Sequence, residues 1–262
     1  MNDTSTIIQE YLNGQSLANL ARANHCKPSD IKAILSQHKV HIRTRGEQNC
    51  FNPQNQRKYS INDSYFSTQS SNMAYLLGFL AADGCVYKNR NLIKIGLSAV
   101  DSDFLVKISE ELNSTFPLHF YQTKDGFEVC EFKFSSYQIK QDLAQYGVVP
   151  NKTGSFSFPS KLESKYYLDF IRGYFDGDGS VSTAGSALRW QICAANPEIL
   201  QSFVDILESY GVKSVKVQHD KRGLFCIQYS TNAVRQLFDI MYSPNCLCLT
   251  RKFIKYKTLL MK

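Results

Sequence analysis

The chain contains one ten-residue pattern twice, YLLGFLAADG at residues 75–84 and FIRGYFDGDG at residues 170–179. The two copies align without gaps, and their last aspartates, Asp83 and Asp178, are 95 residues apart. Small residues recur four positions apart in each copy, which places them on one face of a helix. Glycine inside a helix costs about 1 kcal/mol relative to alanine, so its repeated use indicates two helices that pack backbone to backbone.

The sequence around the motifs repeats with the same offset. A β-rich stretch follows each motif, and a helix comes next, signalled by Asp101 in the first copy and by Asn196-Pro197 in the second. Two alternating strands and a further helix complete each copy. We therefore predict an α+β fold in which the order αββαββα occurs twice, with residues 72–166 as the first half and residues 167–262 as the second.

Residues 4–37 show a helical period that is interrupted at Asn13-Gly14 and before Pro28, which predicts three short helices. Ser16 can cap the second helix, and Asp30 favours the start of the third. Residues 1–45 resemble a helix-turn-helix DNA-binding domain; the alternative is a three-helix cap that contacts only protein. On the first interpretation, the exposed face of the third helix enters a major groove through Ser29, Lys32, Ala33, Ser36 and Gln37.

Residues 46–71 lack a period and are rich in asparagine, glutamine and serine, which predicts a basic polar linker. Basic side chains within and just before this stretch are candidates for contacts with phosphates or a minor groove, and a solvated tether is the alternative. These side chains are Arg43, Arg45, Arg57 and Lys58.

Composition limits the class of protein. The formal net charge of +7 fits a nucleic-acid partner but does not establish one. The longest apolar run, residues 74–82, is too short to cross a membrane, and the first residues do not resemble a signal peptide, so we expect a soluble intracellular protein in the cytoplasm or an organelle matrix. The eight cysteines and five histidines lack metal-binding spacing, which favours reduced thiols over a zinc site.

The aspartates at the end of each motif are candidate metal ligands. Asp83 and Asp178 are each followed by a glycine suited to end a helix, where the helix itself is negative. Two carboxylates there require a positive partner. A hard divalent cation held by the carboxylates, the backbone carbonyls of Ala82 and Gly177, water and a phosphate oxygen meets that requirement, and Mg²⁺ favours such ligands.

Both motifs resemble the LAGLIDADG signature of homing endonucleases, and their duplication resembles the monomeric, two-motif branch over residues 63–262. The resemblance implies two halves joined at the motif helices, with two sheets forming a saddle over double-stranded DNA. It also implies metal-dependent cutting of both strands with short 3′ overhangs, by a monomer that needs no protein partner. We expect Mg²⁺ as cofactor, Mn²⁺ as a substitute, and Ca²⁺ to support binding without cutting. At the sixth motif position Ala81 stands opposite Asp176, a difference that we expect to leave the chemistry intact.

Further catalytic candidates follow from the same resemblance. Lys152 and Lys252 occupy the late position from which a basic residue approaches the scissile phosphate; ordinary phosphate contacts are the alternative. Lys94 and Arg189, again 95 residues apart, occupy the early-strand position that reaches the active-site water, and Gln191 competes with Arg189. Plain groove-facing charges are an equal alternative for these three residues.

Base reading is expected from alternating strand residues on the saddle, and which of them face DNA depends on strand register. Those near hairpin tips, Lys88, Arg90, Lys221 and Arg222, are more favoured as phosphate contacts. The candidates are Lys88, Arg90, Lys133, Lys216, Gln218, Lys221, Arg222 and Gln228.

Three functions compete: a site-specific endonuclease, a DNA-binding transcriptional regulator that has lost cutting, and an intron maturase that binds RNA. The presence of both motif aspartates and both late lysines argues against loss of cutting. The DNA-type helix-turn-helix resemblance argues against the maturase. No intein splicing blocks flank the motifs, which disfavours an intein origin.

Overall fold

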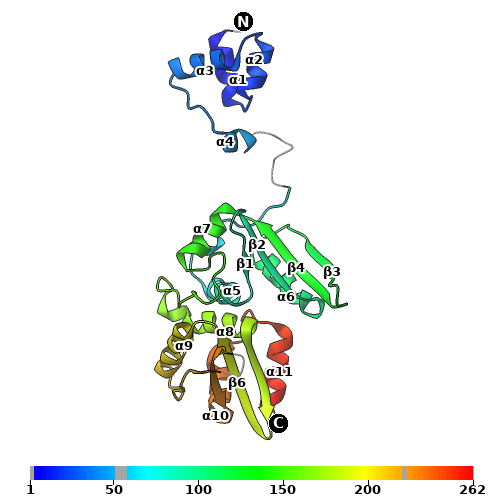
Figure 1. Cartoon of the computed structure of the whole chain (residues 1–262), viewed down its shortest axis with the longest axis vertical. Helices are drawn as coiled ribbons and strands as arrows, with labels where there is room; N and C mark the ends of the chain where they lie inside the picture. Colours follow the sequence, from blue (N-terminus) through cyan, green and yellow to red (C-terminus); the bar gives the residue numbers. More distant parts are fainter. Residues whose placement is uncertain (1–2, 51–57, 220–222, 262) are drawn as a thin grey trace. The chain divides into compact units, whose positions relative to one another are not determined.

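The computed structural model describes residues 3–50, 58–219 and 223–261. The chain forms two compact units, residues 1–58 and residues 59–262 (Figure 1). Each unit has its own apolar core. No helix in the described part of the chain is both long and apolar enough to cross a membrane.

The first unit consists of α1 (Thr4–Leu12), α2 (Leu17–Ala23), α3 (Pro28–Gln37) and the short α4 (Arg45–Cys50). The Ser16 side chain caps α2 by accepting a hydrogen bond from the amide of Asn19 at 3.1 Å. Asp30 Oδ2 accepts from the amide of Lys27 at 2.9 Å and fixes the start of α3. The buried core is contributed by all of α1, α2 and α3, namely Ile7, Tyr11, Leu20, Ala21, Ile31 and Leu35.

The polar linker predicted for residues 46–71 is wrong at both ends. Residues 45–50 form α4, and the second unit begins at Tyr59. Ile61 and Phe66 are 8% and 1% exposed and belong to the core of the second unit. Two isolated apolar residues in a polar stretch produce no period, which is why the sequence did not reveal this packing.

The second unit contains the order αββαββα twice, as predicted, followed by one additional helix. The first half is α5 (Ser71–Ala82), β1 (Cys85–Val86), β2 (Leu92–Ser98), α6 (Ser102–Glu111), β3 (Leu118–Gln122), β4 (Glu128–Ser135) and α7 (Tyr137–Gln145). The second half is α8 (Tyr167–Asp178), β5 (Gly179–Ala184), β6 (Ala187–Ala194), α9 (Pro197–Ser209), β7 (Gln218–His219), β8 (Phe225–Ser230), α10 (Thr231–Met241) and α11 (Thr250–Leu260). Each half has one antiparallel four-stranded sheet, in the orders β1-β2-β4-β3 and β5-β6-β8-β7.

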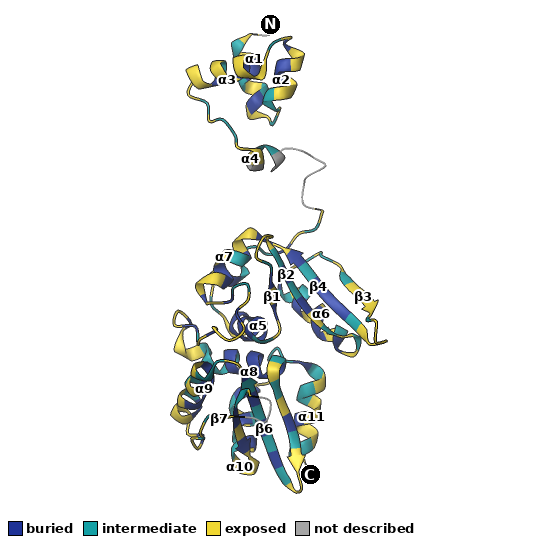
Figure 2. Cartoon of the chain, viewed as in Figure 1, coloured by how far each residue is buried: buried dark blue, intermediate teal, exposed yellow. Residues whose placement is uncertain are grey.

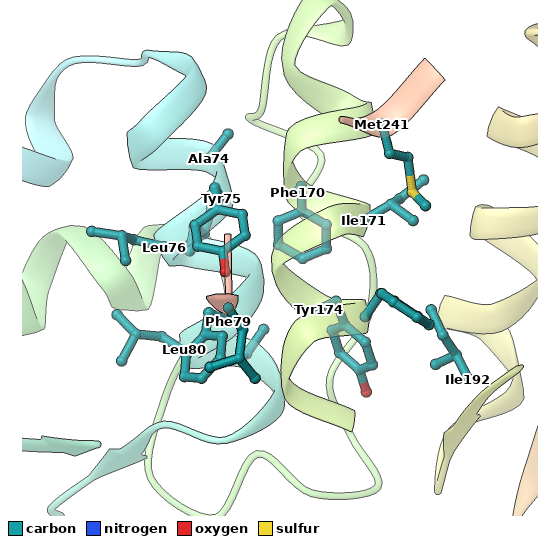
Figure 3. Packing of buried hydrophobic residues seen from close by; sticks show 14 of the residues in the cluster. Ala74, Tyr75, Leu76, Phe79, Leu80, Phe170, Ile171, Tyr174, Ile192 and Met241 are labelled. Carbon is teal, nitrogen blue, oxygen red and sulfur yellow. The ribbon is translucent and has the colours of Figure 1, made fainter. Parts of the chain in front are cut away.

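The motif helices α5 and α8 lie side by side (Figure 3) in the middle of this unit (Figure 1). A Cβ atom added to Gly78 would overlap the carbonyl oxygen of Phe170, and one added to Gly173 would overlap that of Tyr75. The two glycines are 95 residues apart, so the same contact is made from both sides. The close packing of helix backbones expected from the motif is therefore present.

Successive residues of a strand point to opposite faces of its sheet, so each sheet has one face towards the core and one outward face (Figure 2). In β6 the burial alternates residue by residue, with Trp190 and Ile192 buried and Arg189 and Gln191 partly exposed. Pairs of candidate residues are directly opposite on the outward faces: Lys94 with Lys133 in the first sheet and Gln191 with Gln228 in the second.

A chain that begins at Tyr59 is expected to fold as stably as the second unit of the full protein, because the two cores are separate. A chain that begins at residue 72 should lose about 4 kcal/mol or more, since it lacks the buried side chains of Ile61 and Phe66. Urea unfolding of the two truncated chains measures the difference. Equal stability would show that residues 59–71 do not belong to the core.

Candidate active site

The two motif aspartates lie where the ends of α5 and α8 meet. Asp83 is the residue at which α5 ends, and its amide donates to the carbonyl of Phe79 at 2.9 Å. Asp178 is the last residue of α8. A Cβ on Gly177 would overlap that of Ala82 and would lie 3.5 Å from Oδ2 of Asp83. The glycine thus lets the helix ends approach until the two carboxylates are neighbours.

Lys152 and Lys252 anchor their ammonium groups to the backbone just beyond these helix ends. Lys152 Nζ donates to the carbonyl of Gly84 at 2.6 Å, and Lys252 Nζ donates to that of Gly179 at 2.7 Å. Gly84 and Gly179 are equivalent positions in the two motifs, so the contacts are related by the repeat. A cation at this position offsets the negative end of a helix.

The two lysines come from unlike elements. Lys152 lies in the turn region after α7 and is 8% exposed, whereas Lys252 lies on α11. Lys252 Nζ also donates to the carbonyls of Phe175 at 2.8 Å and Asp176 at 2.7 Å. The structure therefore brings Asp83, Asp178 and both lysines together, although one lysine comes from a turn region and the other from a helix.

Electrostatics at this site disfavour the charged forms of all four groups. The aspartates are exposed, yet neighbouring protein atoms displace part of their water. This burial and the nearby Asp83 carboxylate raise the pKa of Asp178 to about 6, although Lys152 and Lys252 lower it. Burial raises the pKa of Asp83 and lowers the pKa of both lysines. A cavity of about 70 Å³ adjoins Asp178 and Lys152.

The raised pKa of Asp178 predicts that Asp178→Asn stabilises the metal-free protein near neutral pH. A carboxyl group whose pKa is higher in the folded protein destabilises the fold as pH rises above the unfolded value of 3.8, and the full cost is present above the folded value of about 6. Because Asp178 is exposed and solvent-screened, we expect a gain of about 1 kcal/mol at pH 7 that disappears towards pH 4. Urea unfolding across this range tests it, and a variant no more stable than the parent at pH 7 contradicts it.

The donor atoms at the helix ends suit a hard cation. Two partly desolvated carboxylates lie together, and a bound cation would lower the pKa of both. No group of three or more His, Cys, Asp or Glu side chains that could hold a metal exists among the described residues. Backbone carbonyls, water or phosphate oxygens would have to complete the ligand set. Lys252 Nζ lies 3.4 Å from the carbonyl oxygen of Gly177 and would compete with a metal for it.

Asp176, which the sequence treated as a harmless difference from Ala81, has a structural role that reasoning from the motif missed. Its side chain is fully buried, and Oδ2 accepts hydrogen bonds from the hydroxyl of Tyr75 at 2.7 Å and from the amide of Leu249 at 2.8 Å. Leu249 is the residue from which α11 begins. Asp176 therefore fixes the start of the helix that carries Lys252. An acidic residue at the motif position where the first copy has Ala81 was the available signal.

A second unpredicted contact fastens α11 to the first half. The Arg251 guanidinium donates to both carboxylate oxygens of Asp101, from Nε at 2.8 Å and from Nη2 at 2.8 Å. Lys107 on α6 donates to the hydroxyl of Thr250 at 2.8 Å. These residues are more than 140 positions apart in the chain, so no local pattern could reveal the pairing.

The early-strand candidates lie on the outward faces of the sheets, where Lys94 is opposite Cys85 and Gln191 is opposite Ser180, each two positions after a motif aspartate. Lys94 Nζ donates to Glu131 Oε1 at 2.9 Å. Gln191 Nε2 lies 3.5 Å from Cys193 Sγ. Across residues 3–50, 58–219 and 223–261, no hydrogen bond or ion pair joins Lys94, Arg189 or Gln191 to Asp83 or Asp178. Glu131 engages the ammonium group of Lys94, and the expectation that Lys94 reaches the active-site water stays a prediction.

Arg43 was expected to contact DNA from an extended arm, but its side chain instead makes hydrogen bonds within the first unit. Its Nη2 donates to the carbonyls of Tyr11 at 2.7 Å and Gln15 at 2.7 Å, and the guanidinium lies 3.9 Å from the Tyr11 ring centroid. These contacts fix the segment after α3 against α1.

The other DNA-binding candidates are mostly exposed. Arg57, Lys221 and Arg222 lie outside the described residues. Lys133 is partly buried beside Glu131, and its ammonium forms an ion pair with that carboxylate. The exposed candidates are Ser29, Lys32, Ala33, Ser36, Gln37, Arg45, Lys58, Lys88, Arg90, Lys216, Gln218 and Gln228.

Solved structures resemble this chain at low sequence identity. The I-LtrWI LAGLIDADG homing endonuclease bound to target DNA is 13% identical, with 76% of this chain and 90% of that chain covered and a TM-score of 0.46. The N-terminal LAGLIDADG domain of WhiA is 14% identical, with 78% and 93% covered and a TM-score of 0.47. I-DmoI in complex with DNA and Ca is 17% identical, with 75% and 99% covered and a TM-score of 0.48.

Two curated relatives come from Methanocaldococcus jannaschii. An uncharacterized protein is 26% identical over 162 residues, which are 58% of this chain and 54% of that protein. The DNA-directed RNA polymerase subunit Rpo1C is 24% identical over 159 residues, which are 59% of this chain and 18% of that subunit. The chain thus spans about half of the first relative and less of the second. Residues 165–239, from just before α8 to a point within α10, match the family model of the LAGLIDADG-like domain.

Proposed function

We propose that this chain is a site-specific DNA endonuclease that uses a divalent metal to cut both strands and leaves short 3′ overhangs. The observation that carries the proposal is the arrangement at the meeting ends of α5 and α8. Two carboxylates and two anchored ammonium groups are gathered there, one of each from either half. A double-strand cut requires two such sets, and one chain supplies both, which supports action as a monomer.

Each residue of the site has a role in this proposal. Asp83 and Asp178 hold the cation, with backbone carbonyls such as that of Ala82 as further ligands. Mg²⁺, or Mn²⁺ in its place, supplies Lewis-acid stabilisation of the phosphate and activation of water when bound. Lys152 and Lys252 offset the negative charge that builds up on the phosphate. Their contacts with Gly84 and Gly179 hold each ammonium group in place before DNA arrives.

The outward faces of the two sheets are the proposed DNA-binding surface, a saddle over the major groove. They carry Lys94 and Lys133 in the first sheet and Arg189, Gln191 and Gln228 in the second. The net charge of +7 supports a polyanionic partner. The first unit acts as a helix-turn-helix module, because the exposed side of α3 presents small and polar side chains that fit a groove.

Cleavage selection from a pool of randomised DNA duplexes in Mg²⁺ tests the proposal. We expect one long sequence to be cut on both strands, and the same sequence to be bound without cutting in Ca²⁺. A protein that binds one sequence tightly and never cuts it with any divalent ion would be a regulator. Selective binding of a structured RNA with no DNA preference would indicate a maturase.

A further inference from the structure

A carboxylate lies at the centre of the outward face of the first sheet. The Glu131 side chain on β4 is only 4% exposed, although it points away from the apolar core. Its Oε1 accepts hydrogen bonds from Lys94 Nζ at 2.9 Å and from the Tyr121 hydroxyl at 3.0 Å, and its Oε2 pairs with Lys133 Nζ. Three neighbouring strands, β2, β3 and β4, thus converge on one acidic group.

A glycine leaves the neighbouring strand open beside this group. Gly96 on β2 is directly opposite Glu131, and a Cβ at that position would lie 3.5 Å from Glu131 Cγ and 3.6 Å from Oε1. The carboxylate therefore lies across β2 with no side chain above it there. Burial raises the pKa of Glu131, but the hydrogen bonds from Lys133, Lys94 and Tyr121 lower it to about 2. The group is charged at any physiological pH and holds both lysines.

The second sheet lacks this cluster. Residues 95 positions after Lys94 and Gly96 are Arg189 and Gln191. Their partners on β8 are Ser230 and Gln228, where the first sheet has Lys133 and Glu131. One outward face thus presents a carboxylate paired with two ammonium groups, and the other presents uncharged amides and a hydroxyl beside one guanidinium.

We propose that Glu131 is a positioning residue that fixes Lys94 and Lys133 so that they select guanine in the part of the target contacted by the first sheet. This inference rests on the proposed DNA-binding function. Each lysine directs one N–H to Glu131 and keeps two for DNA. An ammonium donor matches the adjacent N7 and O6 acceptors of guanine, whereas cytosine presents an amino donor in the same groove.

The contacts between Glu131 and the two lysines also limit which bases the first sheet can bind. A free carboxylate would accept a hydrogen bond from the amino group of cytosine, but Glu131 is 4% exposed and three of its roughly four acceptor sites are already used. Long lysine side chains otherwise sample many rotamers and contact phosphates without selecting a base. Glu131 therefore holds the ammonium groups of Lys94 and Lys133 in fixed positions, and the described strands of the second sheet have no equivalent carboxylate.

Glu131→Gln tests the inference through sequence preference measured by competitive binding to randomised duplexes in Ca²⁺. Its matched control is Glu128→Gln, which makes the same charge change on the opposite face of β4, at an exposed residue. Both variants should bind non-specific DNA at least as tightly as the parent, because each loses a negative charge. Only Glu131→Gln should lose guanine preference, by about tenfold, at positions in one half of the target.

Tyr121→Phe covers the case in which Glu131→Gln fails to fold. It removes one of the hydrogen bonds to the carboxylate and leaves every charge in place, so we expect a smaller loss at the same base positions. Unchanged preference in folded Glu131→Gln, or in Tyr121→Phe if the first variant unfolds, overturns the inference while the proposed function stands. A parent protein that shows no sequence preference removes the proposed function and the inference together.

Discussion

Asp83→Asn and Asp178→Asn are each expected to lower the rate of double-strand cleavage in Mg²⁺ by about a thousandfold or more. Asparagine keeps the size of the side chain but removes the charge that holds a cation, and the described residues around the site offer no third carboxylate as a substitute. Binding of the target in Ca²⁺ should be at least as tight as for the parent, because a negative charge near the phosphates is gone. Single-turnover cleavage and binding assays on one target separate the two effects.

Asp125→Asn is the matched control, since Asp125 is exposed in the hairpin between β3 and β4 and makes the same charge change outside the site. It should cut as the parent does. Each single variant is expected to leave some nicking of one strand, because the two carboxylates come from different helices. Full cleavage by the double variant Asp83→Asn with Asp178→Asn would refute the assignment of the metal site.

Gly78→Ala and Gly173→Ala are expected to destabilise the second unit by about 3 kcal/mol or more. Intrinsic helix propensity predicts the opposite sign, since alanine is favoured over glycine in a helix by about 1 kcal/mol. Here the added methyl group would overlap the backbone carbonyl of Phe170 or of Tyr75, and backbone cannot move aside as a flexible side chain can. Urea unfolding of the chain that begins at Tyr59 measures the change without a contribution from the first unit.

The control for the glycine variants is Gly96→Ala on β2. Its Cβ would make ordinary contact with Glu131 and overlap nothing, so we expect a change within about 1 kcal/mol. If Gly78→Ala and Gly173→Ala were as stable as the parent, the helices would not pack as closely as described.

The sequence predicted the features that depend on local pattern or on repetition. Spacing of small residues identified the faces of α5 and α8 that meet, and the repeat of 95 residues placed Asp83 and Asp178 at equivalent helix ends. The same repeat placed Lys94 and Arg189 at equivalent positions of the strands that follow the motifs. In each case one element, or two copies of it, contained the whole signal.

The features that the sequence missed depend on contacts between residues that are far apart in the chain. No local sequence pattern links the two partners. The sequence around Lys94 does not indicate that its partner is Glu131. The two residues meet because β4, which carries Glu131, pairs with β2. The sequence indicated that the difference at Asp176 leaves the chemistry intact, but it could not show that the amide of Leu249 donates to this carboxylate. Ile61 and Phe66 join the core from a polar stretch, where only the tertiary structure shows that they are buried.

The contacts of α11 bear on how this duplicated protein folds and evolves. The helix belongs to the second half by sequence, yet Arg251 donates to Asp101 of the first half, and Asp176 accepts one of its hydrogen bonds from Tyr75 of the first half. Expressed alone, the second half would leave the Asp176 carboxylate without the Tyr75 hydroxyl and the glycine face of α8 without its partner. The halves are consequently interdependent: they should melt in a single transition, and a gene split between them would yield functional protein only when both fragments are made together.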